Sequence, residues 1–212
     1  MLDLQESMNR KIHPQWGGAG FAFLRAVLVE SVEALDHYGW KWWKAHTPDL
    51  AQLRIELVDI WHFLLSHYLA AARSDRDAAA RAIVEDWTSA AAFTLDGRRY
   101  DPAALDLRER FELLAALSAV RRVHLPLVVS LFQACGMSAE ALYRSYVSKN
   151  VLNHFRQDHG YKSGEYRKLW EGREDNAHME ELLDTLDSGS EALPARLYEA
   201  LERRYRETGA KI

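Results

Sequence analysis

Apolar residues recur at three- and four-residue spacing along nearly the whole chain, and this helical periodicity constrains the fold more than any other feature. Runs that alternate apolar and polar residues, which are typical of half-buried strands, are scarce. Only 5 prolines and 11 glycines interrupt the 212 residues, so long helices can form. The sequence predicts an all-α fold, a multi-helix bundle that forms a single domain over 1–212. Within it, about 138–180 is a candidate for a mobile, lid-like part.

Helix start and stop signals divide the chain into segments. The first long helix is expected over about 20–38, with Gly39 as a left-handed stop. The second covers the apolar run 53–72, with Thr47 as N-cap and Pro48 at the first helical position. Further helices are expected over 77–93 and over 102–124, with a turn at Leu95-Asp96-Gly97 between them. Pro126 is expected to break or kink the chain before a short segment that ends near Cys135. Another long helix should run from the cap Ser138 to Gln157, and two more should follow an irregular stretch over 159–178.

Two pairs of acidic residues stand out on the first two long helices. Glu30 and Glu33 form one pair and Glu56 and Asp59 the other, so each pair projects from one helix face with about 5 to 6 Å between side chains. The second helix is apolar almost all round, which places its acids inside the bundle. Two charges about 6 Å apart repel by about 3 kcal/mol at an effective dielectric near 20. Hard divalent cations, above all Mg²⁺, would offset this repulsion.

Two other interpretations of the four acids stay open. The acids can be exposed, or paired with the cations Arg25, Arg54 or Lys44. Alternatively, Asp59 and His62 stand at the acid-histidine spacing of a ferritin-like di-iron centre. That design needs two such pairs, and the sequence offers one.

A cationic stripe lies far from these acids in sequence. Three- and four-residue steps connect Tyr146, Lys149, Asn153 and Arg156, which therefore share one helix face. The segment beyond it adds further polar groups, namely Tyr161, Lys162, Lys168, Asp175 and Asn176. A triphosphate held by metal-loaded carboxylates and such a face is consistent with phosphoryl-transfer chemistry. A solvated helix face is the alternative.

These features belong to six motifs that follow one another in order along the chain. They are Leu4-Gln5-x-x-x-Asn9, Glu30-x-x-Glu33, Trp40-Lys41-Trp42-Trp43-Lys44, Glu56-Leu-Val-Asp59-Ile-Trp-His62-Phe63, Lys149-Asn150-Val-Leu-Asn153-x-Phe155-Arg156-Gln157-Asp158-x-Gly160-Tyr161-Lys162 and Glu174-Asp175-Asn176. With this set the sequence resembles the dimeric dUTPase family, relatives of the MazG-like all-α nucleotide pyrophosphatases. The segment 75–137 carries no matching motif.

The resemblance implies an enzyme that hydrolyses dUTP to dUMP and pyrophosphate with a Mg²⁺-activated water, accepts dUDP as well, and forms a homodimer. Mn²⁺ is expected to substitute for Mg²⁺. The implied metal ligands are Glu30, Glu33, Glu56 and Asp59, and Glu30 or Glu33 would accept the proton of the water. The implied base-binding residues are Gln5 and Asn9, which would read uracil, and Trp42, which would lie beside the base. His62 would contact the sugar or support a residue that does. The implied phosphate ligands are Lys149, Arg156, Lys162 and Lys168, and the residues implied on the sugar and phosphate side are Asn153, Tyr161 and Asn176. Trp40, Trp43, Trp61 and Phe63 are expected in the core.

Composition sets the remaining expectations. A net charge of −4 argues against a protein that coats nucleic acid. One cysteine and an N-terminus without an apolar signal segment favour the cytoplasm. The longest apolar run, 125–134, is too short for a membrane span.

Two alternative functions remain. One is a broader MazG-like house-cleaning nucleoside triphosphate pyrophosphohydrolase, which would lack a strict base reader such as Gln5 and Asn9. The other is a non-catalytic helical nucleotide-binding module, against which the intact set of four acids argues.

Overall fold

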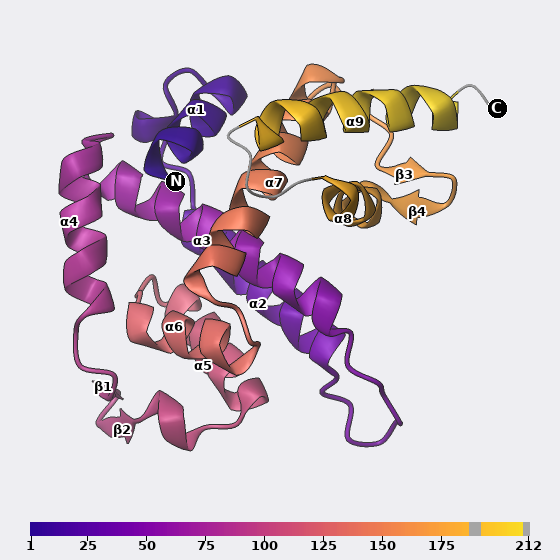
Figure 1. Cartoon of the computed structure of the whole chain (residues 1–212). Coiled ribbons are helices and arrows are strands. Elements are labelled where there is room, and N and C mark those ends of the chain that lie inside the picture. The colour runs from indigo at the N-terminus through magenta and orange to yellow at the C-terminus, as the bar shows by residue number, and fades with distance from the viewer. Residues whose placement is uncertain (187–191, 210–212) are drawn as a thin grey trace. The chain divides into compact units, whose positions relative to one another are not determined.

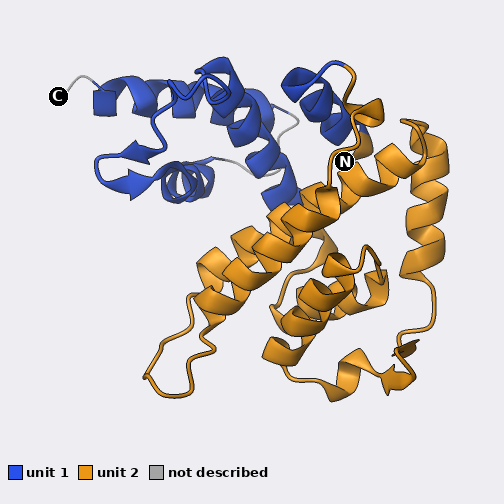
Figure 2. Ribbon diagram, turned by 180° about the vertical axis from the view of Figure 1, so that it is seen from behind, with its two compact units in different colours: residues 1, 3–14, 143–212 blue, residues 2, 15–142 orange. Residues whose placement is uncertain are grey.

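The computed structural model describes residues 1–186 and 192–209, and its elements are helices joined by loops and two short hairpins (Figure 1). The all-α prediction is confirmed. The chain divides into two compact units (Figure 2). Unit 1 comprises residues 1, 3–14 and 143–212, and unit 2 comprises residues 2 and 15–142. The expectation of a single domain with a lid-like part over 138–180 stays a prediction.

Unit 2 is built around two helices that pack side by side, α2 (Phe23–Tyr38) and α3 (Leu50–Ala71) (Figure 1). The side chains of Leu53, Leu57 and Ile60 on α3 are completely buried. Burying one such side chain stabilises a fold by about 1.5 to 3 kcal/mol. The register of α3 is therefore firmly fixed, and with it the places of the acids that α3 carries.

The start of α3 differs from the prediction. The helix begins at Leu50 and its N-cap is Asp49, not Thr47, so Pro48 lies before the helix. The Asp49 carboxylate accepts a hydrogen bond from the main-chain N–H of Gln52 at 3.1 Å. A carboxylate also interacts favourably with the positive end of the helix dipole, which a threonine hydroxyl does less well.

The helix predicted over 77–93 ends early. The observed helix α4 covers Arg76–Trp87, and a hairpin of β1 (Phe93–Leu95) and β2 (Arg98–Tyr100) follows. Asp96 and Gly97 both have positive φ, 49° and 78°, which gives the tight two-residue turn that an antiparallel hairpin requires. The turn predicted here is confirmed, but it joins strands rather than helices.

The helix predicted over 102–124 is also shorter than expected. A 3₁₀ turn, η2 (Pro102–Ala104), precedes α5 (Leu107–Ala119). Asp106 and Glu109 form a reciprocal capping box that starts α5. This pair is a local sequence signal for a helix that begins at Leu107 rather than at Pro102. The expected break at Pro126 is confirmed, because α6 (Leu125–Ala134) carries this proline in its first turn. A further 3₁₀ turn, η1 (Trp16–Gly18), lies before α2.

No single helix within the described residues is long and apolar enough to cross a membrane. Helices α6 and α7 (Ala139–Asp158) satisfy the length and composition criteria together, across a bend of 97°.

Unit 1 contains the other helices and the second hairpin. They are α1 (Leu2–Ile12), most of α7, β3 (Leu169–Trp170), β4 (Arg173–Glu174), α8 (Asp175–Thr185) and α9 (Leu193–Gly209). The expected cap of α7 is confirmed, since Ser138 Oγ accepts the N–H of Ala141 at 3.1 Å. Phe155, Trp170 and Leu197 are completely buried and form the centre of the unit's core.

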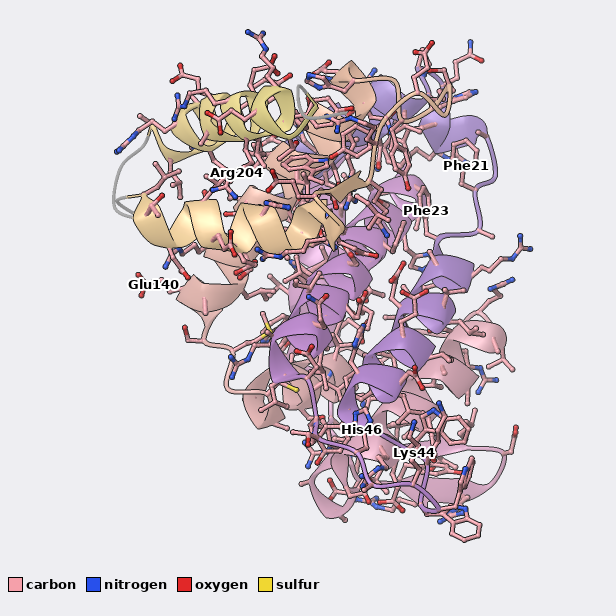
Figure 3. All side chains as sticks on the ribbon, turned by 90° about the vertical axis from the view of Figure 1, so that its right-hand side faces the viewer. Phe21, Phe23, Lys44, His46, Glu140 and Arg204 are labelled. Carbon is pink, nitrogen blue, oxygen red and sulfur yellow. The ribbon has the colours of Figure 1, made fainter. Side chains whose placement is uncertain are left out.

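Two tryptophans that were expected in the core lie in the exposed loop between α2 and α3. Trp40 is 42% exposed and Trp43 58% exposed, so that prediction is wrong, whereas Trp61 on α3 is buried as expected. The Trp40 ring stacks edge-to-face on Trp43, and its Nε1 donates to Asp36. These contacts hold the rings without burying them. Figure 3 labels Lys44 and His46 in the same loop.

Candidate active site

Unit 2 brings three of the four predicted acids together. Glu30 and Glu33 on α2 and Glu56 on α3 each offer a carboxylate oxygen, and these oxygens lie within 4.8 Å of one another. We call these three residues the carboxylate cluster. Glu56 is buried, Glu30 is half-buried and Glu33 is exposed. The cluster forms because the i, i+3 face of α2 lies against the acidic face of α3.

The pKa of Glu30 shows how strongly these acids interact. Burial raises it most, followed by the charge of Asp59, a hydrogen bond to Glu56 and the charges of Glu56 and Glu33, and together these raise the pKa of Glu30 to about 8. Asp59 therefore lies near enough to act on the cluster. At neutral pH, Glu30 keeps its proton and donates it to the Glu56 carboxylate, which relieves one negative charge.

A histidine that the sequence analysis did not assign also reaches the cluster. His37 lies one turn after Glu33 on α2, and its Nε2 is 3.4 Å from Glu56 Oε1. The spacing of 30, 33 and 37 places all three residues on one helical face. That spacing was the signal that could have identified His37.

The donor atoms of the cluster fit a hard divalent cation. They are carboxylate oxygens alone, which Mg²⁺ and Mn²⁺ prefer, and like charges this close favour a cation. The three residues that could hold an ion together are all glutamates, whereas a ferritin-like di-iron centre uses two acid–histidine pairs. Arg54, one of the cations considered as a partner of the acids, donates from Nε to the carbonyl of Cys135 at 2.9 Å, and the ion-pair interpretation stays an alternative.

Two further predicted residues lie in unit 2. His62 is buried on α3, one turn beyond Asp59. Trp42 lies in the loop between α2 and α3 with 90% of its surface exposed, and its ring contacts Trp43 edge-to-face. The structure thus places His62 on the same helix as the acids and Trp42 in a loop.

The two predicted uracil readers lie in unit 1. Gln5 and Asn9 are buried one turn apart on α1, and Gln5 Nε2 donates to Asn9 Oδ1 at 3.1 Å. The hydroxyl of Tyr146, on α7, lies 3.1 Å from both Gln5 Oε1 and the carbonyl of Met1. Tyr146 is completely buried, so it holds α1 against α7 rather than facing solvent.

Four predicted residues form one hydrogen-bonded group with Asp175. Lys149 Nζ donates to Asn176 Oδ1 at 3.0 Å. Arg156 donates to Asn153 Oδ1 at 3.1 Å, to Asn176 Oδ1 at 3.3 Å and to both oxygens of Asp175 at 2.8 Å. We call these five residues the amide–cation group. Lys149 is buried and Arg156 largely so, hence the interpretation of the stripe as a solvated helix face is wrong.

The charge balance of this group depends on Asp175. Burial by itself raises the pKa of Asp175, but the hydrogen bonds and charge of Arg156, the hydroxyl of Tyr166 and the charge of Lys149 outweigh it, and the net pKa is lowered. Asp175 is therefore ionised at neutral pH. With two cations and one anion the group keeps a net positive charge, which suits an anionic ligand.

The side-chain cations of the other two predicted phosphate contacts have partners outside this group. Lys162 Nζ donates to the carbonyl of Ile12 at the end of α1, at 2.9 Å. Lys168 forms an exposed ion pair with Glu174 at 3.4 Å. Tyr161 stays next to the group, with its ring centre 5.9 Å from the guanidinium carbon of Arg156.

Comparison with known proteins adds one finding. A family model described as dUTPase matches residues 1–161. This match includes the carboxylate cluster, Gln5, Asn9 and the α7 stripe, and it ends before Asp175 and Asn176. No curated protein matches the sequence.

Proposed function

Because this chain belongs to the all-α dimeric dUTPase family, a family of dUTP diphosphatases, we propose that it hydrolyses dUTP to dUMP and pyrophosphate with the help of Mg²⁺. The carboxylate cluster is the observation that supports this proposal most directly. Three carboxylates from two helices, within 4.8 Å of one another, are the donors that Mg²⁺ or Mn²⁺ takes.

Glu30, Glu33, Glu56 and Asp59 would hold the ion. When bound, Mg²⁺ supplies charge neutralisation for the phosphates and lowers the pKa of a water molecule. Glu30 would lose the proton that it holds in the metal-free protein when a cation binds. Either Glu30 or the exposed Glu33 could then accept the proton that the attacking water loses. His37 Nε2 lies 3.4 Å from Glu56 Oε1 and would help to hold the Glu56 carboxylate in place.

Nucleotide recognition would fall to the further residues that the family resemblance implies. The amides of Gln5 and Asn9 offer both donors and acceptors, which match the O4 and N3–H edge of uracil. Lys149 and Arg156 would bind the phosphates, with Lys162 and Lys168 as further cations, and Asn153, Tyr161 and Asn176 would contact the sugar and phosphates. Trp42 would lie beside the base and His62 near the sugar. The chain would act as a homodimer, which light scattering after size exclusion tests.

The decisive experiment is a phosphate-release assay with added pyrophosphatase, run over dUTP, dCTP, dTTP and the purine deoxynucleotides. We expect turnover with Mg²⁺ or Mn²⁺, a clear preference for dUTP, and none in excess EDTA. Glu33→Gln removes a ligand oxygen and a charge and should abolish turnover with its helical content unchanged. Glu112→Gln, an exposed acid on α5, is the matched control and should retain wild-type rates.

Each outcome separates the alternatives. Equal hydrolysis of all pyrimidine triphosphates would favour the broader house-cleaning hydrolase. Binding of a dUTP analogue without any turnover would favour a non-catalytic nucleotide-binding module. Full turnover in EDTA would exclude the role assigned to the carboxylate cluster.

A further inference from the structure

Asp175 is the most enclosed charged residue of the amide–cation group. Its side chain is completely buried and accepts three hydrogen bonds at 2.8 Å, two from Arg156 and one from the hydroxyl of Tyr166. A planar guanidinium that is held bidentately cannot rotate without losing both bonds. Asp175 therefore fixes the plane of the Arg156 guanidinium.

The fixed guanidinium determines how two amides are oriented. Asn153 Oδ1 accepts from Nη1 of Arg156, and Asn176 Oδ1 accepts from Nη2 of Arg156 and from Lys149 Nζ. Guanidinium and ammonium groups only donate, so the amide atom that faces them must be oxygen. The Nδ2 group of each amide then points away from the cations.

We propose that Asp175 is a positioning residue for nucleotide binding: through Arg156 it orients the amides of Asn153 and Asn176 so that their Nδ2 hydrogens donate to acceptor oxygens of the nucleotide. This inference rests on the proposed function for the identity of the ligand. It assigns Asp175 no contact with substrate. It also makes Arg156 an organiser of the two asparagines in addition to its charge.

The arrangement matches a ligand that carries only acceptors at this point. Phosphate oxygens accept hydrogen bonds and donate none at neutral pH, so outward amide donors suit them and outward carbonyls would repel them. Because such contacts would form both in the ground state and in the transition state, their loss should raise KM more than it lowers kcat.

The test compares three variants in two assays. Asp175→Asn removes the charge that holds Arg156. Tyr166→Phe removes only the third hydrogen bond and keeps the ion pair. Glu181→Gln is the matched control, because this acid also lies on α8 and pairs with Arg173 at 2.7 Å but is exposed. The first assay is NMR of the Asn153 and Asn176 side-chain amides in the nucleotide-free protein. The second is steady-state hydrolysis of dUTP well below the melting temperature of each variant.

We expect Asp175→Asn to shift both amide signals and to lower kcat/KM for dUTP at least about tenfold, mainly through KM. Tyr166→Phe should give the same shifts with smaller amplitude and about a threefold loss. It keeps the inference testable if Asp175→Asn does not fold. Glu181→Gln should leave both signals in place and kcat/KM within about twofold of wild type.

Unshifted amide signals in a folded Asp175→Asn protein, or wild-type KM in that variant, would overturn the inference. A purely structural role would lower the melting temperature and leave both readouts unchanged. The proposed function fails separately, namely if the wild type does not hydrolyse dUTP. In that case the amide signals still decide whether Asp175 positions the two asparagines.

Discussion

The raised pKa of Glu30 predicts an unusual pH dependence for the stability of the metal-free protein. The pKa is about 8 in the folded state against 4.5 for the ordinary group. Between these values the folded protein holds a proton that the unfolded chain has released. The free energy of unfolding must therefore fall as pH rises from about 4.5 to about 8. Below about pH 4.5, Glu30 is protonated in both states and does not change the free energy of unfolding with pH.

The magnitude follows from the size of the pKa shift. One pKa unit corresponds to about 1.4 kcal/mol, so the full shift sets an upper limit of about 5 kcal/mol. Glu30 is only half-buried, and solvent screening reduces this limit to roughly 2 kcal/mol. A glutamine at this position keeps the shape of the protonated acid and cannot ionise. Relative to wild type, Glu30→Gln should gain about 2 kcal/mol between pH 5 and pH 8, or about 4 to 8 °C in melting temperature.

The assay is urea denaturation followed by circular dichroism at pH 5.0, 6.5 and 8.0, in EDTA so that the cluster stays free of metal. Glu112→Gln serves as the control and should run parallel to wild type at all three pH values. If the difference in unfolding free energy between wild type and Glu30→Gln stays constant over this range, the argument from repulsion and burial is refuted.

Three further predictions concern recognition, mobility and backbone geometry. Gln5→Ala should reduce the ratio of kcat/KM for dUTP to kcat/KM for dCTP, because in wild type cytosine would leave the polar groups of the Gln5 amide unpaired, and the variant lacks that amide. An unchanged ratio would mean that Gln5 does not recognise the base. Hydrogen exchange of the main-chain amides over 149–176 should slow when a non-hydrolysable dUTP analogue and Mg²⁺ are added, and much less when dUMP is added. Equal exchange rates with the two ligands would argue against a mobile segment that closes over the triphosphate. Gly39→Ala should lower the free energy of unfolding by about 1 to 3 kcal/mol in the same urea assay, because Gly39 has φ of 89° and an added Cβ would clash with the ring of His46. An unfolding free energy equal to that of wild type would contradict this prediction.

The acids of the site were predictable because their signal is local. An i, i+3 pair of carboxylates on an apolar helix such as α3 faces inward by the geometry of the helix alone, and Glu56 is buried as expected. The cap at Ser138 and the break at Pro126 likewise depend on the chemistry of one residue. The six motifs follow one another in a fixed order along the chain, and this order indicated the family, which no single acidic pair could indicate.

Other features could not be predicted from the sequence because they depend on tertiary contacts. The bidentate pair of Arg156 and Asp175 joins residues that are 19 positions apart. Nothing in the local pattern separates Asp175, an ion-paired acid, from an ordinary helix-start acid. Apolar character also failed to predict burial for Trp40 and Trp43, because a loop between two packed helices offers no interior to enter. The strands at 93–100 are too short for an alternating pattern to reveal.

The placement of the tryptophans gives the chain a built-in set of optical probes. Of the seven tryptophans, Trp170 alone lies in unit 1, and it is completely buried. Trp16 and Trp61 are buried in unit 2, whereas the three indoles of the loop between α2 and α3 already face solvent. The exposed indoles should emit at long wavelength and be quenched by acrylamide even in the native protein. A variant that retains Trp170 alone would report the melting of unit 1, and one that retains Trp61 alone would report that of unit 2. Intrinsic fluorescence can therefore decide whether the two units unfold in one cooperative step or in two.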